Sequence, residues 1–193
     1  MKKATVFVFC LLASTLLLAC FPIRGEEEIY SSVVRLHVLA ASDTACDQAD
    51  KLAVRDAVLE AYGDILTSCE TSKEAASVLE ERLPEIRSLA REVLRSRESE
   101  ASVTVSLARE EFDRRKYGSM TIPEGTYLSL RIAIGEGEGQ NWWCVLYPPL
   151  CTEAAMGEYT SPDGYFTRPE EELIVGDTVI RLRILEILEA IFG

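Results

Sequence analysis

The sequence predicts an α+β domain in which an antiparallel sheet packs against helices. Several short stretches alternate apolar and polar residues with the two-residue period of a strand, and two longer stretches repeat apolar residues with the period of a helix. The order of these stretches is strand, helices, strands and a terminal helix, which is typical of α+β proteins. At 193 residues the chain is long enough for one ordinary domain.

The first predicted strand runs from Ser31 to Ala40. One face of this strand has only apolar residues, Val34, Leu36 and Val38. The other face has a mixed set, Val33, Arg35, His37 and Leu39, and both sets contain β-branched or apolar side chains. Apolar residues on both faces predict a largely buried strand.

A helix is predicted over residues 44–68, after three residues of types that cap helix N-termini, Ser42, Asp43 and Thr44. Its expected apolar stripe consists of Ala45, Ala49, Leu52, Leu59, Tyr62 and Leu66. A second helix begins at the capping box formed by Thr71 and Glu74. Its expected apolar face consists of Ala75, Leu79, Leu83, Ile86, Ala90, Val93 and Leu94. Pro84 interrupts this pattern, which predicts either one bent helix or a pair of helices.

Three further strands are predicted, over residues 102–108, 126–134 and 141–147. Only the loop Gly135 to Gly139 separates the last two, and we therefore expect them to form a hairpin. Residues 152–177 are rich in Gly, Pro and acidic residues and are predicted to be a loop region, and residues 178–193 an amphipathic helix that packs on the core. The predicted organisation is a targeting segment (1–25), a core domain (30–151), the loop region and the terminal helix.

The N-terminus has the pattern of an export signal. Lys2 and Lys3 precede an uncharged, mostly apolar stretch over residues 4–23, and an acidic run follows it. The stretch is also long enough to remain as a membrane anchor, and any membrane contact is expected there. The string Leu17-Leu18-Ala19-Cys20 resembles a bacterial lipobox, in which Cys20 would be lipidated. Cleavage, anchoring and lipidation all remain open.

The charge balance excludes some partners. Twenty Lys and Arg residues against 32 Asp and Glu residues give a net charge of -12. Binding to phosphate groups requires a basic surface, so nucleic acid is not an expected partner. Electrostatic attachment to anionic lipid is disfavoured for the same reason.

Export also changes how the cysteines are interpreted, because disulfides persist outside the cytosol. Cys144 and Cys151 enclose Pro148 and Pro149, and we predict that they form a disulfide. A disulfide that closes a loop of this size would stabilise the fold by about 2.5 kcal/mol. We expect Cys46 and Cys69 to be free thiols.

No catalytic residue, metal site or cofactor is predicted. His37 is the only histidine, the glycine loop has Gln140 where a nucleotide-binding motif needs its third glycine, and no Gly-x-Ser-x-Gly elbow is present. Two alternatives remain: an exported enzyme of hydrolase type that uses His37 and a thiol, and a binding module of the cell envelope.

Two groups of residues are candidates for a polar cluster or a partner-binding site. The first consists of charged or titratable residues on otherwise apolar surfaces: Arg35, His37, Asp43, Arg55 and Asp56. Such a group either joins helix to strand or recognises a partner. The second is Asn141-Trp142-Trp143, in which the two Trp side chains point to opposite faces of a strand. One Trp can lie in the core, and the other is either covered by a helix or exposed as a binding anchor.

Three segments of the chain resemble the stage II sporulation protein R family. They are Arg35 to Asp43, Asp47 to Val58, and Gly135 to Cys151 with its string Asn141-Trp142-Trp143-Cys144. The resemblance implies a signalling protein that is made in the forespore and secreted across its membrane towards the mother cell. It further implies that the partner is a membrane-embedded aspartic protease of the mother cell, which processes the precursor of the sigma factor sigma-E.

Overall fold

The computed structural model describes residues 26–117 and 120–149, together with the single positions 6, 9, 11, 13 and 14. Its elements, in chain order, are α2 (Glu26–Ser32), β1 (Val34–Leu39), α3 (Ala45–Thr67), α4 (Ser72–Ser96), β2 (Val103–Phe112), β3 (Arg115–Tyr117), β4 (Met120–Ile122), β5 (Gly125–Ile134) and β6 (Asn141–Tyr147). Apart from the single positions, the predicted segments 1–25, 152–177 and 178–193 lie outside the described residues. No helix within the described ranges is both long and apolar enough to span a bilayer.

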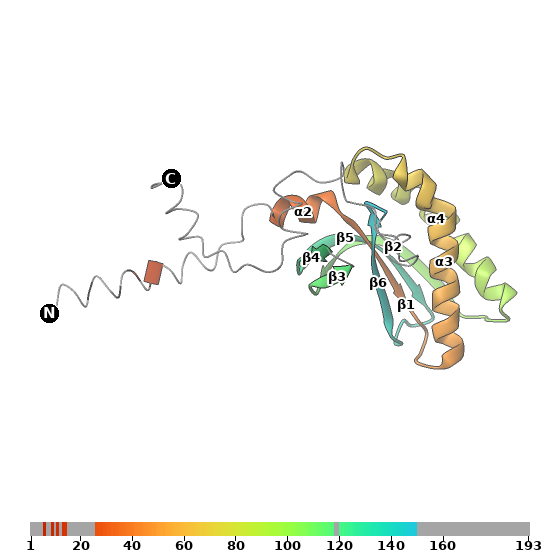
Figure 1. Cartoon of the computed structure of the whole chain (residues 1–193). Coiled ribbons are helices and arrows are strands. Elements are labelled where there is room, and N and C mark those ends of the chain that lie inside the picture. Colours follow the sequence, from red (N-terminus) through yellow and green to blue (C-terminus); the bar gives the residue numbers. More distant parts are fainter. Residues whose placement is uncertain are drawn as a thin grey trace.

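The strands β2, β5, β1 and β6 form one sheet in that order, and helices cover it (Figure 1). The predicted α+β class is confirmed. The sheet is mixed, because β1 pairs in parallel with β5 while β1 with β6 and β2 with β5 pair in antiparallel. The predicted hairpin of residues 126–134 and 141–147 is wrong, because β1 lies between these two strands.

The loop from β5 to β6 must therefore cross the end of β1, and its glycines permit this crossing. Gly135 and Gly137 have φ values of 58° and 70°, in the left-handed region that favours glycine. Gly139 packs so closely against the backbone of Ser42 that a Cβ atom would overlap it. The Gly139 N–H donates to the Ala40 carbonyl at 3.0 Å, which fixes the loop over the strand end.

The helix α4 follows its prediction closely. The Thr71 hydroxyl accepts the Glu74 N–H at 3.2 Å, as expected for the predicted capping box. The helix continues through Pro84 as a single element. Two residues of the predicted apolar face, Leu83 and Val93, are partly buried. The other five are fully buried: Ala75, Leu79, Ile86, Ala90 and Leu94.

The buried face of α3 differs from the predicted stripe in the first half of the helix. Tyr62 and Leu66 are buried as expected, but Leu52 is 36% exposed. The residues buried instead are Asp50, Lys51, Val54 and Val58. Apolar periodicity could not locate this face, because two of the buried side chains are charged and are held there by polar partners.

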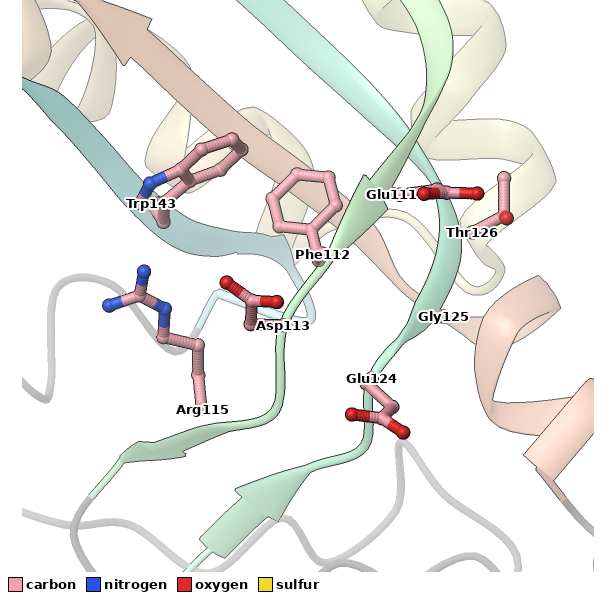
Figure 2. A pocket seen from close by; sticks show the side chains of 8 residues that line it. All are labelled: Glu111, Phe112, Asp113, Arg115, Glu124, Gly125, Thr126 and Trp143. Carbon is pink, nitrogen blue, oxygen red and sulfur yellow. The ribbon is translucent and has the colours of Figure 1, made fainter.

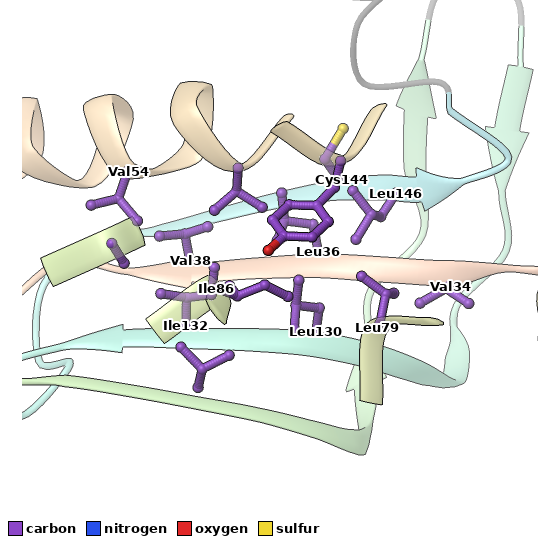
Figure 3. Close-up of a cluster of buried hydrophobic side chains, with 14 of the residues drawn as sticks. Val34, Leu36, Val38, Val54, Leu79, Ile86, Leu130, Ile132, Cys144 and Leu146 are labelled. Carbon is purple, nitrogen blue, oxygen red and sulfur yellow. The ribbon is translucent and has the colours of Figure 1, made fainter. Parts of the chain in front are cut away.

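The main core lies between the sheet and the helices α3 and α4. Figure 3 shows Leu36 and Val38 of β1 facing side chains from both helices, among them Val54 and Ile86. Burying each such side chain stabilises the fold by about 1.5–3 kcal/mol. This layer fixes the orientation of β1, and so determines which side chains reach the opposite face.

A second, smaller cluster lies on the other face of the sheet. It consists of Ile29, Val33, Phe112, Ile122, Tyr127 and Val145, with Tyr30 and Trp143 packed against it. It includes residues of α2 and of β4, which pairs with β3. The sequence did not predict these elements, because the acidic run at Glu26 resembles the flank of a targeting signal and three-residue strands are too short to show a period.

The ion pair between Asp50 and Arg97 joins α3 to the end of α4, with Arg97 Nε 2.6 Å from Asp50 Oδ1. The Asp50 side chain is 2% exposed and that of Arg97 is 37% exposed. We predict that Arg97→Ala lowers the free energy of unfolding by about 3–5 kcal/mol, because it leaves a buried carboxylate without its partner. Asp50→Ala should cost only about 1.5–3 kcal/mol, because the remaining guanidinium can turn to water.

Urea denaturation of the two variants measures this asymmetry. The matched control is Arg95→Ala, which removes an exposed arginine from the same end of α4 and should change stability by less than about 0.5 kcal/mol. A larger loss for Asp50→Ala than for Arg97→Ala would contradict the prediction.

Candidate functional site

Four side chains from four strands meet on the sheet face opposite α3 and α4. We call them the His37 cluster: His37 of β1, Glu110 of β2, Arg131 of β5 and Trp143 of β6. The register brings them together, since His37 lies opposite Arg131 on one side and Trp143 on the other. The His37 ring stacks on the indole of Trp143, with centroids 3.5 Å apart and planes 17° from parallel.

The His37 cluster is joined by polar contacts through the Glu110 carboxylate. His37 Nδ1 lies 3.1 Å from Glu110 Oε1, and Arg131 Nε lies 3.3 Å from the same oxygen. Burial lowers the pKa of His37, while hydrogen bonds and the charge of Glu110 partly oppose this shift, as does the Asn141 side chain. The ring is therefore neutral at pH 7, with Nδ1–H donating to the carboxylate.

A neutral histidine held by a carboxylate can serve as a general base if a nucleophile lies beside its other nitrogen. His37 Nε2 is buried, and within the described part of the chain it has no hydrogen-bond partner. Cys69 and Cys144 belong to the core on the opposite face of the sheet. Cys46 is exposed near the start of α3. The described residues thus place no hydroxyl or thiol in hydrogen-bond contact with this nitrogen.

The lowered pKa of His37 predicts a pH-dependent stability. An unfolded histidine titrates near about 6.5, and the folded one below that value. As the pH falls through this window the unfolded state takes up the proton first, so the free energy of unfolding should decrease. His37→Gln should flatten this dependence between about pH 7 and pH 5. Thermal unfolding across that range measures it, and equal slopes for the two proteins would contradict the prediction.

Arg35 lies beside the His37 cluster on the same face of β1 and is fully buried. Its Nε donates to the Cys144 carbonyl at 3.0 Å. Its guanidinium carbon lies 4.3 Å from the centroid of the Phe112 ring and 5.2 Å from that of Tyr127. Arg35 therefore fills the centre of the second core cluster.

Asp43 lies elsewhere, at the end of β1, where it binds the crossing loop. Its Oδ1 accepts the Gln140 N–H at 2.7 Å. Lys51 Nζ donates to the Gln140 carbonyl at 2.9 Å and to Gln48 Oε1 at 2.6 Å. Burial lowers the pKa of Lys51. These contacts give Asp43 a role in holding the loop from β5 to β6 against the start of α3.

Arg55 and Asp56 form a third group, on α3. The guanidinium of Arg55 lies 4.2 Å from the centroid of the Trp142 ring, and its Nη2 lies 2.6 Å from Asp56 Oδ1. The Asp56 side chain is 63% exposed. The structure thus separates the five polar candidates into three places, because Arg35 and His37 point away from the face of the sheet that α3 covers.

The two tryptophans point to opposite faces of the sheet, as predicted. Trp142 packs against the main core beneath α3, and Trp143 packs against the second cluster. Tyr147 departs from the alternation, because the pairing of β1 and β6 is irregular between Val34 and Arg35. Its side chain turns to the main core, where its hydroxyl donates to the Cys69 carbonyl at 3.3 Å.

Residues 30–156 match the family model described as stage II sporulation protein R. The chain belongs to the stage II sporulation protein R family. Stage II sporulation protein R of Bacillus subtilis (strain 168) is 35% identical to it over 160 residues, which cover 78% of this chain and 71% of the relative. No solved structure matches the chain. This member of the stage II sporulation protein R family is therefore a sporulation protein.

The structure describes three cysteines of this family member, Cys46, Cys69 and Cys144. Cys46 and Cys69 are free, and burial raises the pKa of the Cys69 thiol. Cys144 is disulfide-bonded. Its predicted partner Cys151 and the candidate lipidation residue Cys20 lie outside the described residues, as does most of the segment 4–23. No group of three or more potential metal ligands occurs within the described ranges.

The pairing of Cys144 with Cys151 therefore stays a prediction, and peptide mapping can test it. Tryptic digestion of the oxidised protein without reductant should leave both cysteines in one peptide, because no Lys or Arg lies between them, and reduction should raise the mass of this peptide by that of two hydrogens. Linkage of Cys144 to any other cysteine would contradict the predicted pairing.

Sequence reasoning missed Glu110, Arg131 and Phe112 as parts of the site in this family member. The strand was predicted to end at Ala108, whereas β2 continues to Phe112. Extending the alternation from Thr104 by six residues would have placed Glu110 on the outer face. Arg131 alternates with the apolar residues Leu130 and Ile132 in the sequence, but only the parallel pairing of β1 and β5 brings it beside His37.

Proposed function

We propose that this protein is an exported signal that activates a membrane-embedded aspartic protease of the sporulating mother cell. The protease would then process the precursor of sigma-E. The observation that carries this proposal is the family match over residues 30–156, which includes the described domain from Tyr30 onward. The predicted targeting segment supports export, and the family resemblance is what implies that the membrane crossed is that of the forespore.

Activation in this proposal is a binding event. A ligand shifts a conformational equilibrium only if it binds the two states with different affinities. A shift of the protease from mostly inactive to mostly active therefore requires that this domain bind the active state much more tightly. The rigid sheet, with core clusters on both faces, gives such a ligand a fixed surface.

The proposal assigns no chemistry to the domain itself. If this domain were an enzyme, His37 would be its general base. The contact with Glu110 that orients the His37 ring is the observation behind this alternative. Replacing His37 by Gln, and separately Cys46 by Ala, should leave sigma-factor processing intact in folded protein. Loss of processing in a stable His37→Gln protein would favour the enzyme.

Co-expression with the protease and the sigma precursor tests the function directly. Three arms are needed: the full chain, a version without residues 1–20 that stays in the cytosol, and no chain at all. Processing is expected only with the full chain. Equal processing of the sigma precursor in all three arms would contradict the proposed function.

A further inference from the structure

The strand β2 is one edge of the main sheet, because among the described residues it pairs only with β5. This pairing is regular over all ten residues, from Val103 to Phe112. The backbone N–H and C=O groups on the outer side of an edge strand can pair with a further strand. Natural proteins usually prevent such pairing with charged side chains, prolines, bulges or short edge strands.

The other edge strand, β6, has several of these protective features. It is seven residues long, and two prolines, Pro148 and Pro149, follow it directly. Its pairing with β1 is irregular between Val34 and Arg35. Pairing with a further strand is therefore disfavoured at β6.

The two halves of β2 differ in charge. The C-terminal half contains three consecutive charged residues at positions 109–111. Figure 2 shows the end of this half, where Phe112 points towards Trp143 and Glu111 points away from it. The N-terminal half, Val103 to Ala108, contains only apolar and hydroxyl residues, without a charge or a proline. This half of the edge thus has none of the features that prevent pairing.

We propose that the N-terminal half of β2 pairs with the same segment of a second copy of this chain, in antiparallel about Val105. Opposite residues of an antiparallel pair point to the same face of the sheet. About Val105, Val103 lies opposite Leu107 of the other copy, and Thr104 lies opposite Ser106. The helices of both copies then lie on one side of a continuous eight-stranded sheet.

This register matches each side chain with one of its own kind. On the face that packs against α4, the apolar residues Val103, Val105 and Leu107 meet one another. Leu107 is only partly buried in one copy, and the second copy covers it. On the opposite face, the hydroxyl groups of Thr104 and Ser106 meet, a cross-strand pair that stabilises sheets through a hydrogen bond.

The charged residues of β2 disfavour other registers. A pairing about Ser106 would place Arg109 opposite the core residue Val103. In the proposed register the pairing ends where Glu110 would meet Glu100 of the other copy, because like charges opposite each other are destabilising. The charges therefore restrict the contact to the uncharged half of the strand and determine its register.

Disulfide trapping on the purified full chain tests the pairing and its register. In a host with Cys10, Cys20 and Cys46 replaced by Ala, one chain carries Thr104→Cys and another carries Ser106→Cys. Opposite residues of an antiparallel pair lie within disulfide reach, whereas residues two positions out of register do not. We expect a linked dimer when the two chains are mixed, and little or none with either chain alone.

The control for register mixes the Thr104→Cys chain with an Ala108→Cys chain. These two positions would lie opposite each other only in a pairing about Ser106. A linked dimer in this mixture and not in the first would overturn the proposal. Absence of a linked dimer from both mixtures would overturn it as well.

A lysine at the edge supplies the protective feature that this half of β2 lacks. Thr104→Lys places a charge at an exposed position in the middle of the contact. The two-fold symmetry repeats the change, so the dissociation constant of the dimer should rise about tenfold. Thr67→Lys adds the same charge at an exposed position at the end of α3, and should leave the constant unchanged.

Sedimentation equilibrium of the full chain over a range of concentrations measures these constants. A contact of one pair of strands is smaller than the roughly 1,200–2,000 Å² of stable complexes, so the dimer should dissociate on dilution. Equal constants for the two lysine variants would overturn the proposal, and the melting temperature of each variant confirms that it is folded. If the chain is monomeric at every concentration while Thr104→Lys alone stops processing of the sigma precursor, the edge binds a strand of another protein and the second copy is excluded.

Discussion

Gly139→Ala should destabilise the domain by about 3 kcal/mol, the upper part of the range for overpacking. The added Cβ would overlap the carbonyl group of Ser42, which is backbone and cannot rotate away as a long side chain can. The φ of Gly139 is not in the left-handed region, so the cost comes from space and not from backbone conformation. Urea denaturation at constant pH measures the loss.

Gly63→Ala is the matched control for this substitution. Nothing lies within 4 Å of the Cβ position at Gly63, which is inside α3. Because alanine favours a helix interior over glycine by about 1 kcal/mol, this variant should be more stable than the natural protein. If Gly139→Ala is as stable as the natural protein, the loop does not cross β1 as closely as described.

Arg35→Ala should also have a large effect, a loss of about 3–5 kcal/mol, because it empties the centre of the second core cluster. Arg35→Met keeps most of the side-chain volume and should recover about 2 kcal/mol of that loss, since about 0.8 kcal/mol is regained per buried methylene. Chemical denaturation of both variants gives the difference.

The comparison of alanine with methionine separates packing from charge. Replacing a buried charge by a well-packed apolar side chain is often neutral, whereas an emptied site is not. The exposed Arg91→Ala serves as the control for loss of an arginine away from the core. Equal losses for Arg35→Ala and Arg35→Met would show that the guanidinium and its contact with Cys144, not the volume, determine stability.

The sequence predicted the individual elements better than their arrangement. Alternation located β1, β5 and β6, and the capping box at Thr71 located the start of α4, because these signals depend on neighbours in the chain. The place of β1 between β5 and β6 depends on contacts between residues about ninety positions apart, such as Val34 with Leu128. A short connecting loop suggests a hairpin, and no local signal indicates that another strand lies between.

The site was predicted in part for the same reason. Arg35 and His37 were correctly placed on one face of β1, and Trp142 and Trp143 on opposite faces of β6, because a strand fixes these directions. The partners of His37 depend on the order of strands, which the sequence did not predict. Asp50 and Lys51 misled the prediction for α3, since a charged residue becomes buried only when a distant partner satisfies it.

The position of β1 at the centre of the sheet affects when the domain can fold. This strand is synthesised early, yet its two neighbours follow about a hundred residues later. At about 5–20 residues per second, a ribosome needs about 5–20 s to supply them. During that interval the chain has no complete sheet, and a pathway that threads unfolded polypeptide can take it up. Late completion of the sheet would thus keep the newly made chain suited to the proposed export.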